Sequence, residues 1–337
     1  MTQKNSFTFV LTAEQRERLH LFAAEMRYKT FAVPHTTLAF EASNCRVNLY
    51  TSGKCLVQGK GAEDFVLYFL EPTVLQTAGL GYEEILNPGA FEPHMGSDES
   101  GRGDFFGPLV TAAAYVDKDL IHAMQELGIK DCKLLTDKQT LFLGARLREL
   151  LGRERHTVVA MGPEAYNRLY GKFNNVNNLL AWAHARCIEN LLETVPDCPR
   201  AVADQFAAEH VIKRALIQKG KKIKLEQRHK AEDDMAVAAA SVLAREGFLR
   251  GLHRLGESVG ATLPKGATDV VGTAIEIVRK HGPAVLARVA KCHFTTTDRV
   301  LAAAGFSRKD LPADARAQSR SAQGRAFHAP RAGNPDS

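Results

Sequence analysis

The most constraining stretch of this 337-residue chain joins two adjacent acidic residues to a glycine-rich turn. Asp98 and Glu99 end a strand-like segment, and the apolar run Pro108 to Val116 begins soon after the turn, as a second buried strand would. We therefore expect the two acids at the mouth of a folded core. Carboxylate oxygens suit hard divalent cations such as Mg²⁺, and glycine lets a backbone approach a substrate closely. The glycine spacing matches neither the dinucleotide-binding fingerprint nor a P-loop.

Length and composition indicate a soluble globular protein of roughly two domains. Hydrophobic residues make up 45% of the chain and charged residues 24%. The formal net charge is +6 and the pI is near 9.0, which favours polyanionic partners without requiring them. Neither a secretion signal nor an apolar run of membrane-spanning length is found, so we expect a cytoplasmic protein without membrane contact. The six cysteines form no Cys-x-x-Cys pair, and neither a zinc site nor a disulfide scaffold is predicted.

Residues 1–71 are predicted to form a small α+β domain. Strand-like Ser6 to Leu11 precedes a helical stretch, Ala13 to Met26. The further elements are strands at Thr37 to Phe40, Arg46 to Tyr50 and Cys55 to Gln58, and a second helix at Ala62 to Leu70. Residues 72–92, which contain several glycines and prolines, are interpreted as a linker.

Residues 93–308 alternate apolar strands with amphipathic helices, as α/β domains do. Val158 to Met161 and Ala201 to Ala203 are predicted as short buried strands. Met235 to Arg245 is predicted as an Ala-rich helix whose small side chains permit close packing against a sheet. Residues 309–337 are rich in Ala, Arg, Ser, Gly and Pro, and this composition predicts a disordered tail.

A third acidic residue, Asp204, could join Asp98 and Glu99. It directly follows the apolar triplet Ala201 to Ala203, at the carboxyl end of a predicted strand, where α/β sheets place ligands and catalysts. Asp204 could equally be a helix N-cap, because Asp is favoured there and the next residues could begin a helix. The sequence alone leaves the two interpretations even.

A fourth carboxylate is expected from Glu232, Asp233 or Asp234, which precede the Ala-rich helix. Acids at a helix start also stabilise the helix dipole, so a purely structural role is an alternative for each. Four converging carboxylates would repel one another strongly unless cations neutralised them, and their meeting would itself indicate metal. Two Mg²⁺ ions about 3.5 to 4 Å apart stabilise both the attacking water and the departing oxygen in phosphodiester hydrolysis.

Several motifs together resemble the type 2 ribonucleases H. Gly96 to Val110 is similar to the first active-site motif of that family, and Asp104 to Pro108 is similar to its ribonuclease HIII form in particular. Other similar stretches are Asp131 to Asp137, Asn174 to His184, Asp204-Gln205-Phe206, Lys230-Ala231-Glu232, Ala236 to Arg245 and Lys291 to Phe294. Leu49 to Lys54 and Val57 to Gly61 resemble the substrate-binding domain of ribonuclease HIII. The resemblance covers about Ser6 to Val300.

The resemblance implies a ribonuclease H-like mixed sheet flanked by helices, preceded by an α+β domain similar to the TATA-box-binding-protein fold. It implies an endoribonuclease that cuts the RNA strand of RNA/DNA hybrids and leaves 3′-hydroxyl and 5′-phosphate ends. The active site would hold two Mg²⁺ or Mn²⁺ ions through Asp98, Glu99, Asp204 and Glu232. The family pattern Lys-Ala-Glu favours Glu232 over its acidic neighbours. We expect a monomer that needs no small-molecule cofactor.

The resemblance also implies substrate contacts in two regions. The backbone of Gly101, Arg102 and Gly103 would contact ribose 2′-hydroxyls near the cut, where glycine is needed sterically, and the Arg102 side chain would face phosphate. The contacts of the N-terminal domain would come from Tyr50, Lys54, Gln58 and Lys60. For Tyr50, core packing is a rival interpretation.

Two other functions stay open. The first is ribonuclease HII-type incision at a single ribonucleotide embedded in DNA, because Arg102 stands where ribonuclease HIII usually has Lys. The N-terminal domain and Glu232 count against it, since ribonuclease HII has Asp at the fourth acidic position. The second is a non-catalytic hybrid-binding protein, although all four acids that catalysis would need are present.

Overall fold

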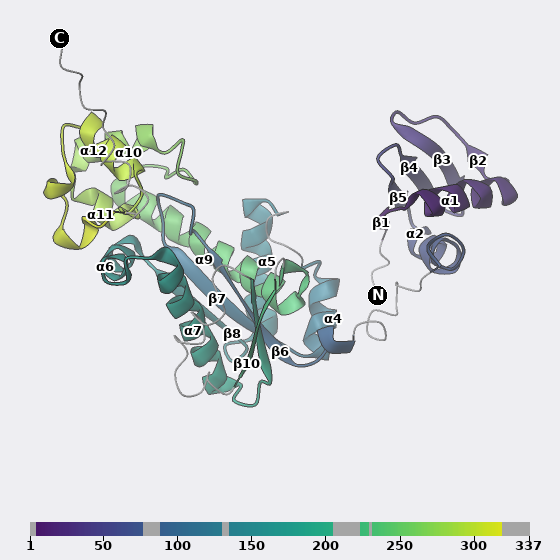
Figure 1. The fold of residues 1–337 in the computed structure, drawn as a ribbon, viewed down its shortest axis with the longest axis horizontal. Coiled ribbons are helices and arrows are strands. Elements are labelled where there is room, and N and C mark those ends of the chain that lie inside the picture. Colours follow the sequence, from purple (N-terminus) through teal and green to yellow (C-terminus); the bar gives the residue numbers. More distant parts are fainter. Residues whose placement is uncertain (1–4, 77–87, 130–134, 205–222, 229–230, 319–337) are drawn as a thin grey trace, which may run out of the picture. The chain divides into compact units, whose positions relative to one another are not determined.

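The structure is a computed structural model that describes residues 5–76, 88–129, 135–204, 223–228 and 231–318. The chain divides into two compact units, Met1–Phe91 and Glu92–Ser337 (Figure 1). Both predicted parts of the fold are present, a small α+β unit and a mixed sheet flanked by helices. None of the helices in the described ranges has the length and apolar character needed to cross a bilayer.

The N-terminal unit is an antiparallel sheet with its helices against one face. Its strands pair in the order β1-β5-β4-β3-β2. They are β1 (Ser6–Val10), β2 (Lys29–Thr30), β3 (Thr36–Ala42), β4 (Cys45–Tyr50) and β5 (Lys54–Gln58), and the helices are α1 (Ala13–Glu25), α2 (Ala62–Phe65) and the π-helix η1 (Val66–Leu75). Alternate strand residues such as Phe7, Val47 and Val57 form one buried cluster with Leu19 and Phe65 of the helices. The predicted strands and first helix are confirmed.

The second helical stretch of this unit is longer than the sequence predicted. The π-helix η1 continues through Pro72 to Leu75, and Val74 is fully buried in the domain core. Residues 72–75, which we expected in the linker, therefore belong to the N-terminal unit. Apolar burial of Val74 outweighs the helix-breaking tendency of Pro72. Residues 77–87 lie outside the described part.

The C-terminal unit is built on a mixed sheet with the strand order β10-β9-β6-β7-β8. Its strands are β6 (His94–Ser100), β7 (Leu109–Val116), β8 (His156–Met161), β9 (Arg200–Asp204) and β10 (Lys224–Arg228). β7 pairs antiparallel with both β6 and β8, whereas β9 pairs in parallel with both β6 and β10. The larger helices are α4 (Lys118–Glu126), α5 (Asp137–Leu151), α6 (Pro163–Phe173), α7 (Val176–Thr194), α9 (Met235–Val259), α10 (Val271–His281), α11 (Val285–Val289) and α12 (Thr296–Ala303).

Helices α7 and α9 cover opposite faces of the sheet. Met95 packs in one core cluster with α7 residues, while its neighbour Gly96 lies under α9. A Cβ on Gly96 would approach the backbone nitrogen of Val237 to 2.2 Å, so glycine is required for this close contact. The predicted Ala-rich helix is confirmed, and it continues past Arg245 because buried Phe248 and further apolar residues extend its packed face.

The first part of the segment that was predicted to be disordered is folded. Arg308–Asp310 and Ala313–Ala315 form single helical turns. Leu311 and Ala315 are 1% and 2% exposed, and Arg316 donates to the carbonyl oxygens of Leu311 and Lys309. The assignment of disorder from residue 309 is therefore wrong for residues 309–318. Residues 319–337 lie outside the described part.

Candidate active site

Asp98 lies near the end of β6, the middle strand of the sheet, on the face covered by α9. Its Oδ1 accepts a hydrogen bond from the backbone N–H of Glu99 at 2.8 Å, and Ser241 of α9 hydrogen-bonds its carboxylate as well. Burial, followed by the neighbouring Glu99 charge, raises the pKa of Asp98 to about 6, although both hydrogen bonds oppose the rise. A nearby divalent cation would offset both causes, so this carboxylate is suited to one.

Glu99 turns to the opposite face, where α7 supplies its partner. His184 is fully buried, with Nε2 3.0 Å from Oε2 of Glu99 and Nδ1 3.0 Å from Oγ of Ser97. A carboxylate only accepts, so Nε2 donates to Glu99, and Nδ1 of a neutral ring accepts from the Ser97 hydroxyl. The ring therefore fixes the direction of the Glu99 carboxylate. In the sequence His184 was visible as the end of the family-like stretch Asn174 to His184, with no sign of this contact.

Strand β9 brings Asp204 beside β6. The parallel register pairs Gly96 with Val202 and Ser97 with Ala203, and Asp98 and Asp204 are the next residues on the two strands. Asp204 is the last residue of β9, so its predicted place at the carboxyl end of a strand is confirmed. The structure describes its backbone but not its side chain.

Glu232 lies in a single turn, η5 (Ala231–Asp233), directly before α9. Buried Ala231 packs with Val202 of β9 and Val237 of α9. This contact places the backbone of Glu232 near the strand that ends in Asp204. The side chain of Glu232, like that of Asp204, lies outside the described part.

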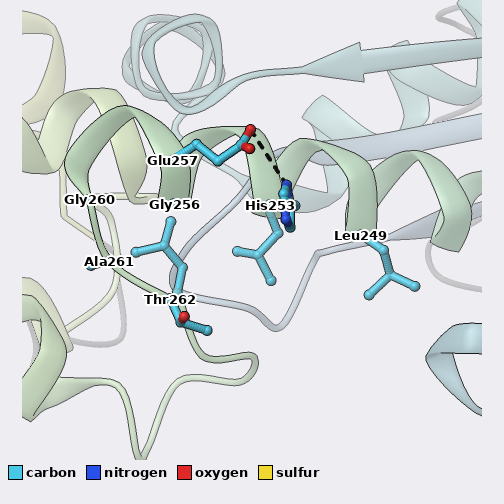
Figure 2. Close-up of a pocket in the computed structure, with 9 residues that line it drawn as sticks. Leu249, His253, Gly256, Glu257, Gly260, Ala261 and Thr262 are labelled. Carbon is cyan, nitrogen blue, oxygen red and sulfur yellow. Dashed lines mark ion pairs between the residues drawn. The ribbon is translucent and has the colours of Figure 1, made fainter.

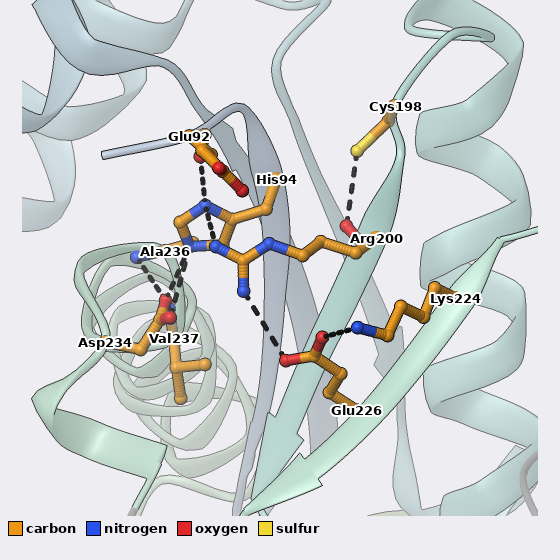
Figure 3. Close-up of polar contacts among 9 residues, drawn as sticks. All are labelled: Glu92, His94, Cys198, Arg200, Lys224, Glu226, Asp234, Ala236 and Val237. Carbon is orange, nitrogen blue, oxygen red and sulfur yellow. Dashed lines mark hydrogen bonds and ion pairs between the residues drawn. The ribbon is translucent and has the colours of Figure 1, made fainter. Parts of the chain in front are cut away.

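Asp234, another candidate for the fourth carboxylate, makes structural contacts at the start of α9 (Figure 3). Its Oδ1 accepts from the backbone N–H groups of Ala236 and Val237 at 3.0 and 3.3 Å, as a helix N-cap does. The same oxygen lies 2.9 Å from Nε2 of His94, and both side chains are buried. Asp234 therefore ties the start of α9 to the start of β6. These contacts support the structural interpretation of Asp234, so Glu232 and Asp233 remain as candidates for the fourth acid.

The glycine-rich turn after β6 has a tightly defined shape at Gly101. Its φ is +91°, and a Cβ there would lie 2.2 Å from the Pro108 carbonyl oxygen, so glycine is required. A Cβ on Gly103 would meet no atom within 4 Å, so the fold itself does not require glycine at this position. Only a substrate that approaches Gly103 closely would require it. Nη2 of Arg102 donates to Oδ1 of Asn177 at 2.9 Å, and Nη1 lies 3.7 Å from Oε1 of Glu99. The Arg102 side chain is thus held beside the acids.

Three of the predicted N-terminal contacts share one face of their sheet. Tyr50, Lys54 and Gln58 alternate with the core residues Leu49, Cys55 and Val57, so they lie opposite the helix-covered face. Lys54 and Gln58 are exposed and Tyr50 is half-buried, so packing in the helix-covered core does not apply to Tyr50. Lys60 lies apart from them, in the turn after β5, where it lines a cavity of 290 Å³.

The cavity in Figure 2 is not this site. It measures about 410 Å³ and lies along the C-terminal half of α9. Its acidic residue, Glu257, lies 3.5 Å from His253, and no second carboxylate lines it. Among the side chains that the structure describes, no three His, Cys, Asp or Glu groups gather around a common point, but Asp204 and Glu232 are not among those side chains. The cysteines whose side chains the structure describes are free and buried.

Known proteins match both units. Residues 95–297 match the family Ribonuclease HII, and residues 8–78 match a domain of unknown function, DUF3378. Ribonuclease HIII of Protochlamydia amoebophila (strain UWE25) is 37% identical over 306 residues, which are 90% of this chain and the whole of that protein. The chain belongs to the ribonuclease HIII family. It is therefore a ribonuclease H enzyme, and the resemblance of its motifs is confirmed.

Other ribonucleases HIII match this one over most of their length. The protein of Chlamydia trachomatis serovar L2 (strain 434/Bu) is 42% identical over 272 residues, 80% of this chain and 88% of that one. The crystal structure of Bst-RNase HIII in complex with Mn²⁺ has a TM-score of 0.62 at 27% identity, and the match covers 89% of this chain and 99% of that one. The match thus includes both units of this chain, and a divalent metal is bound by that relative.

Proposed function

We propose that this ribonuclease HIII hydrolyses the RNA strand of RNA/DNA hybrids at the ends of β6 and β9, leaving 3′-hydroxyl and 5′-phosphate ends. The observation that carries the proposal is the register of these strands, which makes Asp98 and Asp204 neighbours. Glu99 follows Asp98 on β6, and Ala231, the residue before Glu232, packs against Val202 of β9. Acids from three separate stretches of the sequence would thereby meet at the ends of these strands.

The donor set fits two Mg²⁺ or Mn²⁺ ions, held by Asp98, Glu99, Asp204 and Glu232. Carboxylate oxygens are the ligands that such ions prefer, and burial leaves Asp98 with a raised pKa, which a cation would lower. When bound, two ions stabilise the charge on the attacking and departing oxygens of a phosphodiester. The Mn²⁺ complex of Bst-RNase HIII supports this assignment.

The chain itself fixes the acids before a substrate arrives. The amide of Glu99 and the Ser241 hydroxyl hold Asp98, and His184 holds Glu99. Each carboxylate is thus oriented by a group from a different element, and preorganisation of this kind lowers the barrier to reaction.

Recognition of the hybrid is assigned to two surfaces. The backbone of residues 101–103 would contact ribose 2′-hydroxyls, and the open space beside Gly103 leaves room for a sugar. In the N-terminal unit, Lys54 and Gln58 with half-buried Tyr50 would present a polar sheet face to the duplex, and exposed Lys60, in the turn after β5, would make a separate contact. Selection of hybrids would follow, because a 2′-hydroxyl is required on one strand and deoxyribose on the other.

The test is cleavage of an end-labelled RNA/DNA hybrid with Mg²⁺ or Mn²⁺ by the wild type and by Asp98→Asn. We expect internal cuts with 3′-hydroxyl and 5′-phosphate ends by the wild type and none by the variant, which still binds the hybrid. A DNA duplex with one embedded ribonucleotide is the comparison substrate. More efficient cutting of that duplex would favour HII-type incision, and binding without cleavage by the wild type would favour a hybrid-binding protein.

A further inference from the structure

A lysine is buried where the glycine-rich turn returns to the sheet. Lys291 is fully buried, and its Nζ lies 2.7 Å from the carbonyl oxygen of Gly107 and 3.2 Å from that of Phe106. The carbonyl oxygen of Pro108 lies 3.5 Å away. Three carbonyl groups thus converge on one ammonium group, which offers three donors. Nothing in the proposed chemistry uses this side chain directly.

The main chain around Lys291 holds the same turn. The backbone N–H of Lys291 donates to the Phe105 carbonyl oxygen at 2.8 Å, and the N–H of Gly107 donates to the Val289 carbonyl oxygen at 3.0 Å. Phe106 and Ala290 form an isolated antiparallel bridge between the two segments. Lys291 therefore contacts the carbonyl groups of four consecutive residues, 105 to 108, with its backbone and side-chain nitrogens.

A second segment holds the turn from its other side. Oδ1 of Asp104 accepts from the backbone N–H of Gly266 at 2.6 Å, and the N–H of Phe105 donates to the Gly266 carbonyl oxygen at 2.7 Å. Gly101 and Gly107, with φ of +91° and +86°, stand at the two ends of the turn. The loop of residues 101–108 is thus a restrained element that leads from the acids of β6 into β7.

An apolar side chain would fill the space of Lys291 without the cost of burying a charge. That cost is real, because burial lowers the pKa of Lys291 to about 7, while Asp104 acts in the opposite direction. The presence of a lysine at position 291 is therefore explained by its hydrogen-bond donors and not by the volume that its side chain fills. Without them, the three converging carbonyl oxygens would lose their partner in a buried site and the turn would shift to find others.

We propose that Lys291 is a positioning residue that holds loop 101–108 so that its backbone meets the ribose next to the cut. The inference rests on the proposed function of this loop. Lys291 touches no substrate in this account and acts through the carbonyl groups of Phe106 and Gly107. A displacement of about 1 Å at a reacting centre can lower a rate by roughly 10²-fold, so a loosened loop is expected to affect kcat.

The experiment compares Lys291→Met with Leu147→Ala in the full chain. Methionine keeps the length and removes the donors, whereas Leu147→Ala opens a cavity under α5, in the same unit, without touching the loop. Both are measured for thermal unfolding, for kcat and hybrid Kd, and for hydrogen exchange at the amides of Phe105 and Gly107. Lys291→Gln, which keeps amide donors, tests partial rescue and serves in place of Lys291→Met if that variant does not fold.

We expect Lys291→Met to lower kcat on the hybrid by roughly 10²-fold with little change in Kd, and to speed exchange at the two loop amides. Leu147→Ala should lose stability without either effect, and Lys291→Gln should recover part of kcat. Equal kcat per folded molecule in Lys291→Met and Leu147→Ala would overturn the inference. A wild type that cuts no hybrid would overturn the proposed function instead, and the exchange rates would still test whether Lys291 holds the loop.

Discussion

Replacing Asp98 by Asn should stabilise the metal-free protein at neutral and alkaline pH while abolishing cleavage. Burial and the Glu99 charge raise the pKa of Asp98 from an ordinary value of 3.8 to about 6. Between these values the folded protein binds more protons at this site than the unfolded chain does. Stability therefore falls as the pH rises through this window and stays lower above pH 6.

The difference between 3.8 and about 6 corresponds to about 3 kcal/mol of unfolding free energy above pH 6. Asparagine avoids this cost because it carries no charge, and its carbonyl oxygen can still accept from the Glu99 amide. For a domain of this size the gain corresponds to a rise in Tm of roughly 6 to 12 °C. Below pH 4 both proteins are neutral at this position, and the gain should vanish.

The assay is thermal or urea unfolding with a metal chelator, from pH 4 to pH 8. Asp137→Asn is the matched control, and its expected change in stability has the opposite sign. The hydrogen bond from Lys265, and then Arg245, hold the pKa of Asp137 below its usual value. That variant should lose stability at pH 8, and the loss should disappear as the pH falls through the carboxyl range. An Asp98→Asn protein no more stable than the wild type at pH 8 would refute the electrostatic account of this site.

Three further predictions address the other parts of the site. His184→Phe should fold but need more Mn²⁺ for half-maximal cleavage, by roughly 10- to 100-fold, because Glu99 loses the group that orients it; an unchanged Mn²⁺ requirement would argue against this role. Gly101→Ala should lose more than about 1 kcal/mol in urea unfolding, whereas Gly103→Ala should keep its stability and lose hybrid cleavage; equal stability of the two variants would contradict the described turn. Lys54→Ala should weaken hybrid binding and reduce the slope of log K against log salt by about 1, and an unchanged slope would remove Lys54 from the interface.

Sequence reasoning located the elements whose side chains follow a simple apolar pattern. The buried strand Ala201 to Ala203 and the Ala-rich helix after Asp234 were predicted because one face of each is uniformly apolar or small. Strand β10 (Lys224–Arg228) was not predicted, because it is a sheet-edge strand with no apolar pattern. Among its described side chains, Leu225 alone is buried. An edge position permits this polarity.

The contacts that orient the site could not be predicted, since they join residues far apart in the chain. Ser97 and His184 meet because Ser97 points to the α7 face of the sheet, and this depends on the strand register and the helix placement together. Lys291 meets Gly107 only through the bridge that aligns their segments. The motif Lys291 to Phe294 was visible in the sequence, but its chemistry became clear only from the carbonyl groups around Nζ.

Metal binding at the proposed site requires that Asp204 and Glu232 direct their carboxylates toward Asp98 and Glu99. Anomalous diffraction from crystals of the wild type grown with Mn²⁺ tests this directly. We predict two manganese peaks bounded by these four side chains, with Asp98 within reach of both ions. No manganese at this edge of the sheet, or an Asp204 or Glu232 carboxylate too distant to share an ion with Asp98, would contradict it.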